Sequence, residues 1–151
     1  MRVTLVNPFY TMWKPEARYV EWALGRQPPL GLLSLAAHVR RHLPDVAVNI
    51  LDAAAASLSA EETAERVAAQ APDVVGLTLT TMVVPMAGDV AERIKARLPR
   101  TTVVIGGPHV SGTGPDALRQ SPAFDLGVFG EGEETFRAIL ETLREGRWAE
   151  G

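Results

Sequence analysis

The sequence predicts an α/β protein built on a five-stranded parallel sheet with helices on both faces. Five short runs of β-branched and aliphatic residues recur along its 151 residues, and segments with apolar residues at helical spacing lie between them. The runs are apolar almost throughout instead of alternating, which indicates strands that are covered on both faces. Because crossovers between parallel strands are right-handed, few topologies remain, and we expect a flavodoxin-like (Rossmann-like) sheet of order 2-1-3-4-5.

The elements follow one another in strict alternation. The first helix candidate begins at Pro29, a residue suited to a first helical turn, and ends before Pro44. The second opens with Ser59 and Glu62, a capping box in which each side chain satisfies a free backbone N–H. The strands are expected at residues 2–6, 46–51, 74–79, 102–105 and 126–129. The helices are expected at residues 29–42, 59–70, 85–98, 115–120 and 131–144.

Composition excludes several classes of function. The chain has no cysteine, which excludes a disulfide framework, a thiolate zinc site, a cysteine nucleophile and an iron–sulfur cluster held by these residues. A net charge of -3 without long runs of like charge argues against nucleic-acid and anionic-membrane partners. No apolar run approaches the ~20 residues of a membrane span, and the apolar start is too short for a signal peptide. We therefore expect a soluble, cytoplasmic protein.

One connection is much longer than the fold requires. Residues 7–28 join the first strand to the first helix, where about two to six residues would suffice. Five of the nine aromatic residues lie in this segment, which argues against simple disorder. They are Phe9, Tyr10, Trp13, Tyr19 and Trp22. Two roles remain open for the segment: contact with a ligand or a neighbouring domain, or cover for its own edge of the sheet.

Ligands of open parallel sheets bind beyond the carboxyl ends of the strands, where the strand order reverses, here after strands one and three. A phosphoacceptor receiver needs an acidic cluster, an aspartate and a lysine at that edge, but the sequence offers Asn7, Thr80 and Glu131. A flavodoxin phosphate loop needs small residues where residues 8–13 are bulky. The Gly-x-Gly runs at 112–114 and 130–132 go on to Ala117 and Thr135, and neither follows the first strand as a dinucleotide fingerprint requires. A phosphoacceptor receiver, a flavodoxin and a dinucleotide-binding domain are thus disfavoured.

Small and polar residues nevertheless gather at this edge. Gly106 and Gly107 follow the fourth strand directly, so that either a bulky ligand approaches the backbone or the chain makes a plain tight turn. Thr78 and Thr80 share one face of the third strand, and their hydroxyls either point into one cavity or serve only the strand. Asp52 follows the second strand, where capping a turn is favoured over bonding a ligand amide.

Five motifs in this order resemble the cobalamin-binding domain at the N-terminus of cobalamin-dependent radical SAM enzymes. The likeness spans nearly the whole chain, and the combination of motifs is more specific than any one of them. The motifs are Asn7-Pro8, Pro28-Pro29-Leu30-Gly31, Gly76-Leu77-Thr78, Gly106-Gly107-Pro108-His109 and Gly130-Glu131-Gly132-Glu133.

The resemblance implies that the corrin ring lies across the carboxyl edge of the sheet and that the nucleotide tail runs down a groove beside strands three and four. Thr78 and Thr80 match the Ser-x-Leu-type site next to the tail, although Thr80 replaces the usual leucine. The glycines at 106–107 match the pair that admits the tail, and residues 130–131 match the turn over its nucleotide end. The implied cofactor-binding set is Asn7, Pro8, Pro29, Gly31, Thr78, Thr80, Thr81, Gly106, Gly107, Pro108, His109, Gly130, Glu131 and Gly132.

The lower face of the cobalt is expected to carry no histidine. The best-known cobalamin domains place Asp-x-His-x-x-Gly after the first strand, and this sequence has no such motif. Radical SAM relatives typically lack it too, so the resemblance implies cobalamin with its base detached (base-off, His-off). His109 is placed better to hydrogen-bond the tail or a backbone carbonyl than to bind cobalt. We expect no catalytic side chain and no side-chain metal ligand in this chain.

The sequence is therefore interpreted as a cobalamin-binding domain at residues 1–145, with residues 146–151 beginning a linker. The fragment alone is not expected to be an enzyme. The resemblance implies a longer methyltransferase or cyclase whose radical SAM domain, in the same chain, holds a 4Fe–4S cluster and S-adenosylmethionine. Two alternatives remain, a stand-alone corrinoid carrier and a receiver-like interaction module without a ligand.

Overall fold

The computed structural model describes residues 1–9 and 27–146 as a single parallel sheet covered by helices. The strand order is β2-β1-β3-β4-β5, which confirms the predicted flavodoxin-like topology. All four strand pairs are parallel, as the apolar runs indicated. The strands are β1 (Arg2–Asn7), β2 (Ala47–Asp52), β3 (Val74–Thr78), β4 (Thr102–Gly106) and β5 (Leu126–Gly127).

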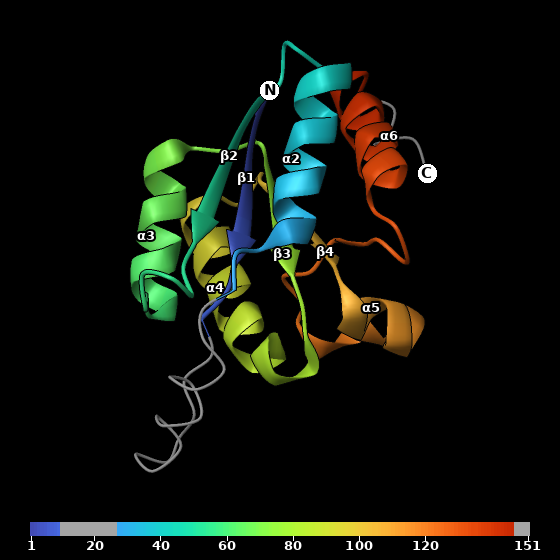
Figure 1. Ribbon diagram of the computed structural model, residues 1–151. Coiled ribbons are helices and arrows are strands. Elements are labelled where there is room, and N and C mark those ends of the chain that lie inside the picture. Colours follow the sequence, from blue (N-terminus) through green and yellow to red (C-terminus); the bar gives the residue numbers. More distant parts are fainter. Residues whose placement is uncertain (10–26, 147–151) are drawn as a thin grey trace.

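Helices cover both faces of the sheet (Figure 1). Helices α2 (Leu30–His42) and α6 (Glu133–Arg144) lie together on one face, and α3 (Ala60–Gln70) and α4 (Val84–Arg97) lie on the other. Each face buries its own apolar cluster. Phe136 and Leu5 belong to the cluster under α2 and α6, and Ile94 and Leu77 belong to the cluster under α3 and α4. The two clusters hold the sheet as the middle of three layers.

The helix ends follow the signals in the sequence. Ser59 caps α3 through its side chain, and the Glu62 carboxylate accepts from the Ser59 backbone N–H, which confirms the capping box. Hydrogen bonds from the Ser59 backbone and hydroxyl lower the pKa of Glu62. Among the described residues, no helix is long and apolar enough to cross a membrane.

The segment after β4 differs from the expectation. Residues 108–113 form an unpredicted helix, α5 (Pro108–Thr113), and the expected helix at 115–120 is a 3-10 helix, η3 (Gly114–Gln120). No element was expected from the sequence at these residues, but the first-turn proline of α5 supports the helix. A short 3-10 turn, η2 (Thr81–Val83), precedes α4. Strand β5 is shorter than predicted because only two of its residues pair with β4.

Candidate functional site

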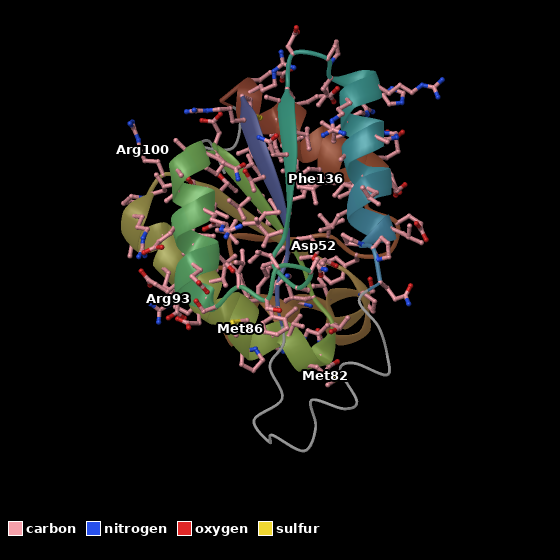
Figure 2. All side chains as sticks on the ribbon, turned by 60° about the vertical axis from the view of Figure 1, so that its left-hand side comes forward. Asp52, Met82, Met86, Arg93, Arg100 and Phe136 are labelled. Carbon is pink, nitrogen blue, oxygen red and sulfur yellow. The ribbon has the colours of Figure 1, made fainter. Side chains whose placement is uncertain are left out.

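The parallel register brings the ends of the strands together. Asn7 at the end of β1 is paired with Asp52 at the end of β2, and Thr78 at the end of β3 is paired with Gly106 at the end of β4. Figure 2 shows Asp52 and Met82 toward the end of the molecule where the strands stop. The residues that leave the strands therefore form one edge, as the topology predicted.

A groove opens from this edge along the face that α2 and α6 cover. We call it the side groove; its volume is about 170 Å³. Leu5 and Phe136 contribute apolar lining at the sheet, and α2 adds Leu32 and Leu35. Six further lining residues have no side chain. These are Gly31, Gly76, Gly106, Gly107, Gly130 and Gly132.

The two adjacent glycines after β4 serve different purposes. A Cβ on Gly107 would lie 2.9 Å from the backbone oxygen of Leu79, and Gly107 has φ +103°, so the fold itself requires glycine there. A Cβ on Gly106 would meet Val128 at 3.8 Å or more, which is ordinary van der Waals contact. Among the described residues, no neighbour excludes a side chain at Gly106. Gly106 lines the side groove, and the fold does not require glycine there.

A second cavity of about 180 Å³ lies at the carboxyl edge; we call it the edge cavity. It shares Gly31, Leu32 and Thr78 with the side groove, so the two cavities adjoin. The hydroxyl residues Thr78 and Thr80 both line it, which favours the first of the two alternatives left open by the sequence, a common cavity. Its remaining lining comes from Asn7, Gln27, Pro29 and Val83. The edge cavity is thus the more polar of the two.

Two side chains at this edge are held by hydrogen bonds. The Asn7 Nδ2 amide donates to Asp52 Oδ1 at 2.9 Å, and the Ala55 backbone N–H donates to the same oxygen at 2.9 Å. Asp52 therefore caps the turn after β2, which was the favoured interpretation. It also fixes the side chain of Asn7, which the sequence did not indicate.

Helices α2 and α6 are joined across the outer wall of the side groove. The Ser34 hydroxyl donates to Glu133 Oε1 at 2.7 Å, and this hydrogen bond is the main cause of a lowered pKa at Glu133. His38 Nε2 lies 3.3 Å from Glu134 Oε1, without hydrogen-bonding geometry. The pKa of Glu134 is also lowered, chiefly by a hydrogen bond from Arg137. Glu133 thus joins α6 to α2, and Glu134 pairs with Arg137 within α6. Both roles are structural, as expected for carboxylates in a first helical turn.

His109 does not face either cavity. Its side chain is buried on α5, where Nδ1 lies 3.1 Å from the Thr81 hydroxyl and Nε2 lies 2.9 Å from Gln120 Oε1. Since Gln120 Oε1 can only accept, Nε2 carries the hydrogen and Nδ1 accepts from Thr81. Both ring nitrogens are therefore engaged within the protein. Thr81, Pro8 and Pro108 also lie outside the two cavity linings.

The remaining predicted site residues all line a cavity: Asn7, Pro29, Gly31, Thr78, Thr80, Gly106, Gly107, Gly130, Glu131 and Gly132. Reasoning from sequence missed Phe136 and Gly76 as lining residues. Phe136 sits one turn inside α6 and was indistinguishable from other core residues. Gly76 had a signal, because glycine inside an apolar strand marks a close approach. Its absent Cβ would lie 2.7 Å from Leu5 Cδ2.

The comparison with protein families decides the assignment. Residues 19–140 match the family described as the B12 binding domain. The chain belongs to this family. Its likeness extends to an uncharacterized methyltransferase of Pyrococcus horikoshii, 39% identical over 152 residues, which cover 100% of this chain and 31% of that protein. An anaerobic magnesium-protoporphyrin IX monomethyl ester cyclase of Rubrivivax gelatinosus is 28% identical over 149 residues, covering 98% of this chain and 25% of the cyclase.

The fold of this B12-binding domain is shared with a solved structure. The cobalamin-dependent S-adenosylmethionine radical enzyme OxsB, solved with aqua-cobalamin bound, superposes with a TM-score of 0.74 at 18% identity. The match covers 95% of this chain and 19% of OxsB. The resemblance seen in the sequence is thereby confirmed. The chain spans only a quarter to a third of the two curated relatives described above.

The two cavities fit the chemistry of cobalamin. A mainly apolar groove with six glycines in its lining suits a flat aromatic base, and Phe136 offers it an aromatic side chain. Hydroxyl and carboxamide side chains at the edge cavity match the amide-rich periphery of a corrin. Within residues 1–9 and 27–146, no three His, Cys, Asp or Glu side chains gather in a way that could hold a metal ion.

Proposed function

We propose that this B12-binding domain holds cobalamin for a longer radical SAM enzyme, a methyltransferase or a cyclase. The single observation that carries the proposal is the side groove, an apolar groove beside β3 and β4 whose lining includes six glycines. Membership of the B12-binding family supports it. The similarity to a methyltransferase and a cyclase supports the class of enzyme.

The two cavities would hold different parts of the cofactor. The side groove, with Leu5, Gly106 and Phe136, would take the nucleotide tail and its base. The edge cavity, with Asn7 and Thr78, would take the amide side chains of the corrin. Bound cobalamin supplies a cobalt centre able to carry and transfer a methyl group. The chain itself binds and orients the cofactor and keeps water from the buried base.

Base-off, His-off binding is part of the proposal. Both nitrogens of His109 already have partners in the protein. His38 and His42 stack on each other on α2, with ring centroids 4.3 Å apart, and neither lines a cavity. The described residues thus offer no free histidine at the edge of the sheet, and a base seated in the side groove would be away from the cobalt.

A radical SAM domain in the same chain would hold the iron–sulfur cluster and S-adenosylmethionine. Two features support this. The relatives extend well beyond the matched region. Large apolar side chains are also exposed around the carboxyl edge, where a neighbouring domain would cover them. They are Leu30, Leu33, Met82 and Phe129.

The proposal is tested by mixing the purified 151-residue chain with hydroxocobalamin and recording the absorption spectrum after gel filtration. We expect retained cobalamin with a base-off spectrum. A chain that retains no cobalamin at micromolar concentration contradicts the proposal, and a histidine-ligated spectrum contradicts its axial-ligand part. The tryptophans of the long segment, Trp13 and Trp22, lie outside the described residues. Quenching of their fluorescence on binding would support contact between that segment and the corrin.

A further inference from the structure

The carboxamide of Asn7 has a fixed orientation. Its Nδ2 lies 2.9 Å from Asp52 Oδ1, and an ionised carboxylate offers only acceptors, so the NH₂ end must face Asp52. The Asp52 carboxylate is itself held by the Ala55 backbone N–H on the same oxygen. The carboxamide of Asn7 therefore cannot turn over without placing its oxygen against a carboxylate.

This orientation leaves the oxygen of Asn7 available. Within the described part of the chain, no donor makes a hydrogen bond to Asn7 Oδ1, and Asn7 lines the edge cavity. The other polar groups of this cavity include the hydroxyls of Thr78 and Thr80, which can rotate to donate or to accept. The Asn7 carboxamide differs from them because it presents an acceptor of fixed direction.

We propose that Asp52 is a positioning residue that turns the Asn7 carboxamide so that Oδ1 accepts a hydrogen bond from a primary amide of a bound corrinoid. The edge cavity would then distinguish corrinoids that carry a carboxamide at this position from those that carry a carboxylate. The inference rests on the proposed function and names a specificity determinant within it.

The discrimination follows from donor and acceptor chemistry. A primary amide donates its N–H to Asn7 Oδ1, whereas a carboxylate at the same place sets an acceptor against an acceptor. An unsatisfied or opposed polar pair in a partly buried site weakens binding by about tenfold or more. The negative charge of Asp52 behind Asn7 disfavours the carboxylate further. A hydroxyl in place of Asn7 would rotate and lose this selectivity.

The probes are cobalamin and its monocarboxylate derivatives, in which one peripheral amide at a time is hydrolysed. Their dissociation constants are measured by absorbance titration at pH 7 with the 151-residue chain and its variants. The wild-type chain should bind at least one monocarboxylate about tenfold more weakly than cobalamin. Asp52→Ala should bring this ratio close to one, because it removes both the anchor of the oriented acceptor and the negative charge behind it. Asn7→Ala should lower the ratio to the smaller part that the Asp52 charge alone supplies.

Asp52→Asn is the matched variant that separates orientation from charge. Its Oδ1 can still accept from both Asn7 Nδ2 and the Ala55 N–H, and the Ala55 bond keeps that oxygen in place. It should therefore retain most of the discrimination that Asp52→Ala loses. A purely structural role for Asp52 would instead lower thermal stability and weaken binding of all corrinoids alike, with the ratio unchanged.

The outcomes separate the inference from the proposed function. If the wild-type chain binds no cobalamin, the proposed function fails and the inference fails with it. If cobalamin binds but no monocarboxylate is disfavoured, only the inference is overturned. Loss of discrimination in a folded Asp52→Asn would also overturn the positioning role. Should Asp52→Ala unfold, Asn7→Ala still decides, because it leaves the Asp52–Ala55 turn bond intact.

Discussion

Substitution of Gly31 by leucine tests the proposed binding groove most directly. Gly31 lies in the first turn of α2 and lines both cavities, and an added Cβ would have no atom of the described residues within 4 Å. The branched end of a leucine there enters the space that we assign to cobalamin. Because leucine favours helix over glycine, Gly31→Leu should unfold no more easily than the wild type, with a gain of ~0.3–1 kcal/mol.

The effect on binding should be opposite in sign. Overpacking of a filled site costs about 1–3 kcal/mol, which corresponds to a dissociation constant for hydroxocobalamin about 5 to 150 times higher. The side groove is only about 170 Å³, so four added carbon atoms remove a substantial share of it. The assay is absorbance titration with hydroxocobalamin, together with urea unfolding of the free chain.

Gly112→Leu is the matched control. Gly112 is also helical, and among the described residues no atom lies within 4 Å of an added Cβ, but it belongs to α5 and lines neither cavity. It should leave cobalamin affinity unchanged. Equal affinities for the wild type, Gly31→Leu and Gly112→Leu would refute the assignment of the groove. An equal loss in both variants would attribute the effect to the fold instead.

Three further outcomes are expected. Gly107→Ala should lower the free energy of unfolding by at least about 2 kcal/mol, because Gly107 has a positive φ and an added Cβ would press on the backbone of Leu79. Gly106→Ala should change the free energy of unfolding by less than about 1 kcal/mol. Similar values for the two variants would contradict the conclusion that the fold requires glycine only at Gly107. Phe136→Ala should cost ~3–5 kcal/mol in urea unfolding and also weaken cobalamin binding; retained affinity would remove Phe136 from the site. Ser59→Ala should cost ~1 kcal/mol at pH 7. Because the folded-state pKa of Glu62 is lowered, its carboxylate stabilises the capping box above its ordinary pKa, and this part is lost as pH falls. The difference in melting temperature between wild type and variant should therefore narrow in acid to the part that the Ser59 hydroxyl supplies to the Glu62 N–H; a difference that stays constant with pH would exclude Glu62 from the cap.

The fold could be predicted because its signals are local. The apolar run of β3 and the capping box of α3 each determine an element from a few adjacent residues. The same local reasoning failed at α5, for which no helix was expected and which packs through its buried residue Val110. It failed at β5 because the length of a strand depends on its pairing with a neighbour, and only Leu126 and Gly127 pair with β4.

The candidate site could be predicted only as a set of positions. Residues at the strand ends were expected to meet, and ten of the predicted site residues line the two cavities. The orientation of each side chain was not predictable. His109 followed the glycine pair in sequence, yet the helical turn of α5 directs its ring to Thr81 and Gln120. Phe136 was assigned no part in the site, yet it lines the side groove.

The sequence by itself determined the parallel sheet, its order, the edge where the functional residues gather and the resemblance to cobalamin-binding domains. Hydrophobic periodicity and the order of motifs are visible in the amino-acid sequence alone. Only the tertiary structure decided that the backbone at Gly107 requires glycine while Gly106 has room for a Cβ, and that Asn7 hydrogen-bonds Asp52. These distinctions depend on distances between atoms far apart in sequence, and they arise only when the strands have paired and the helices have packed on the sheet.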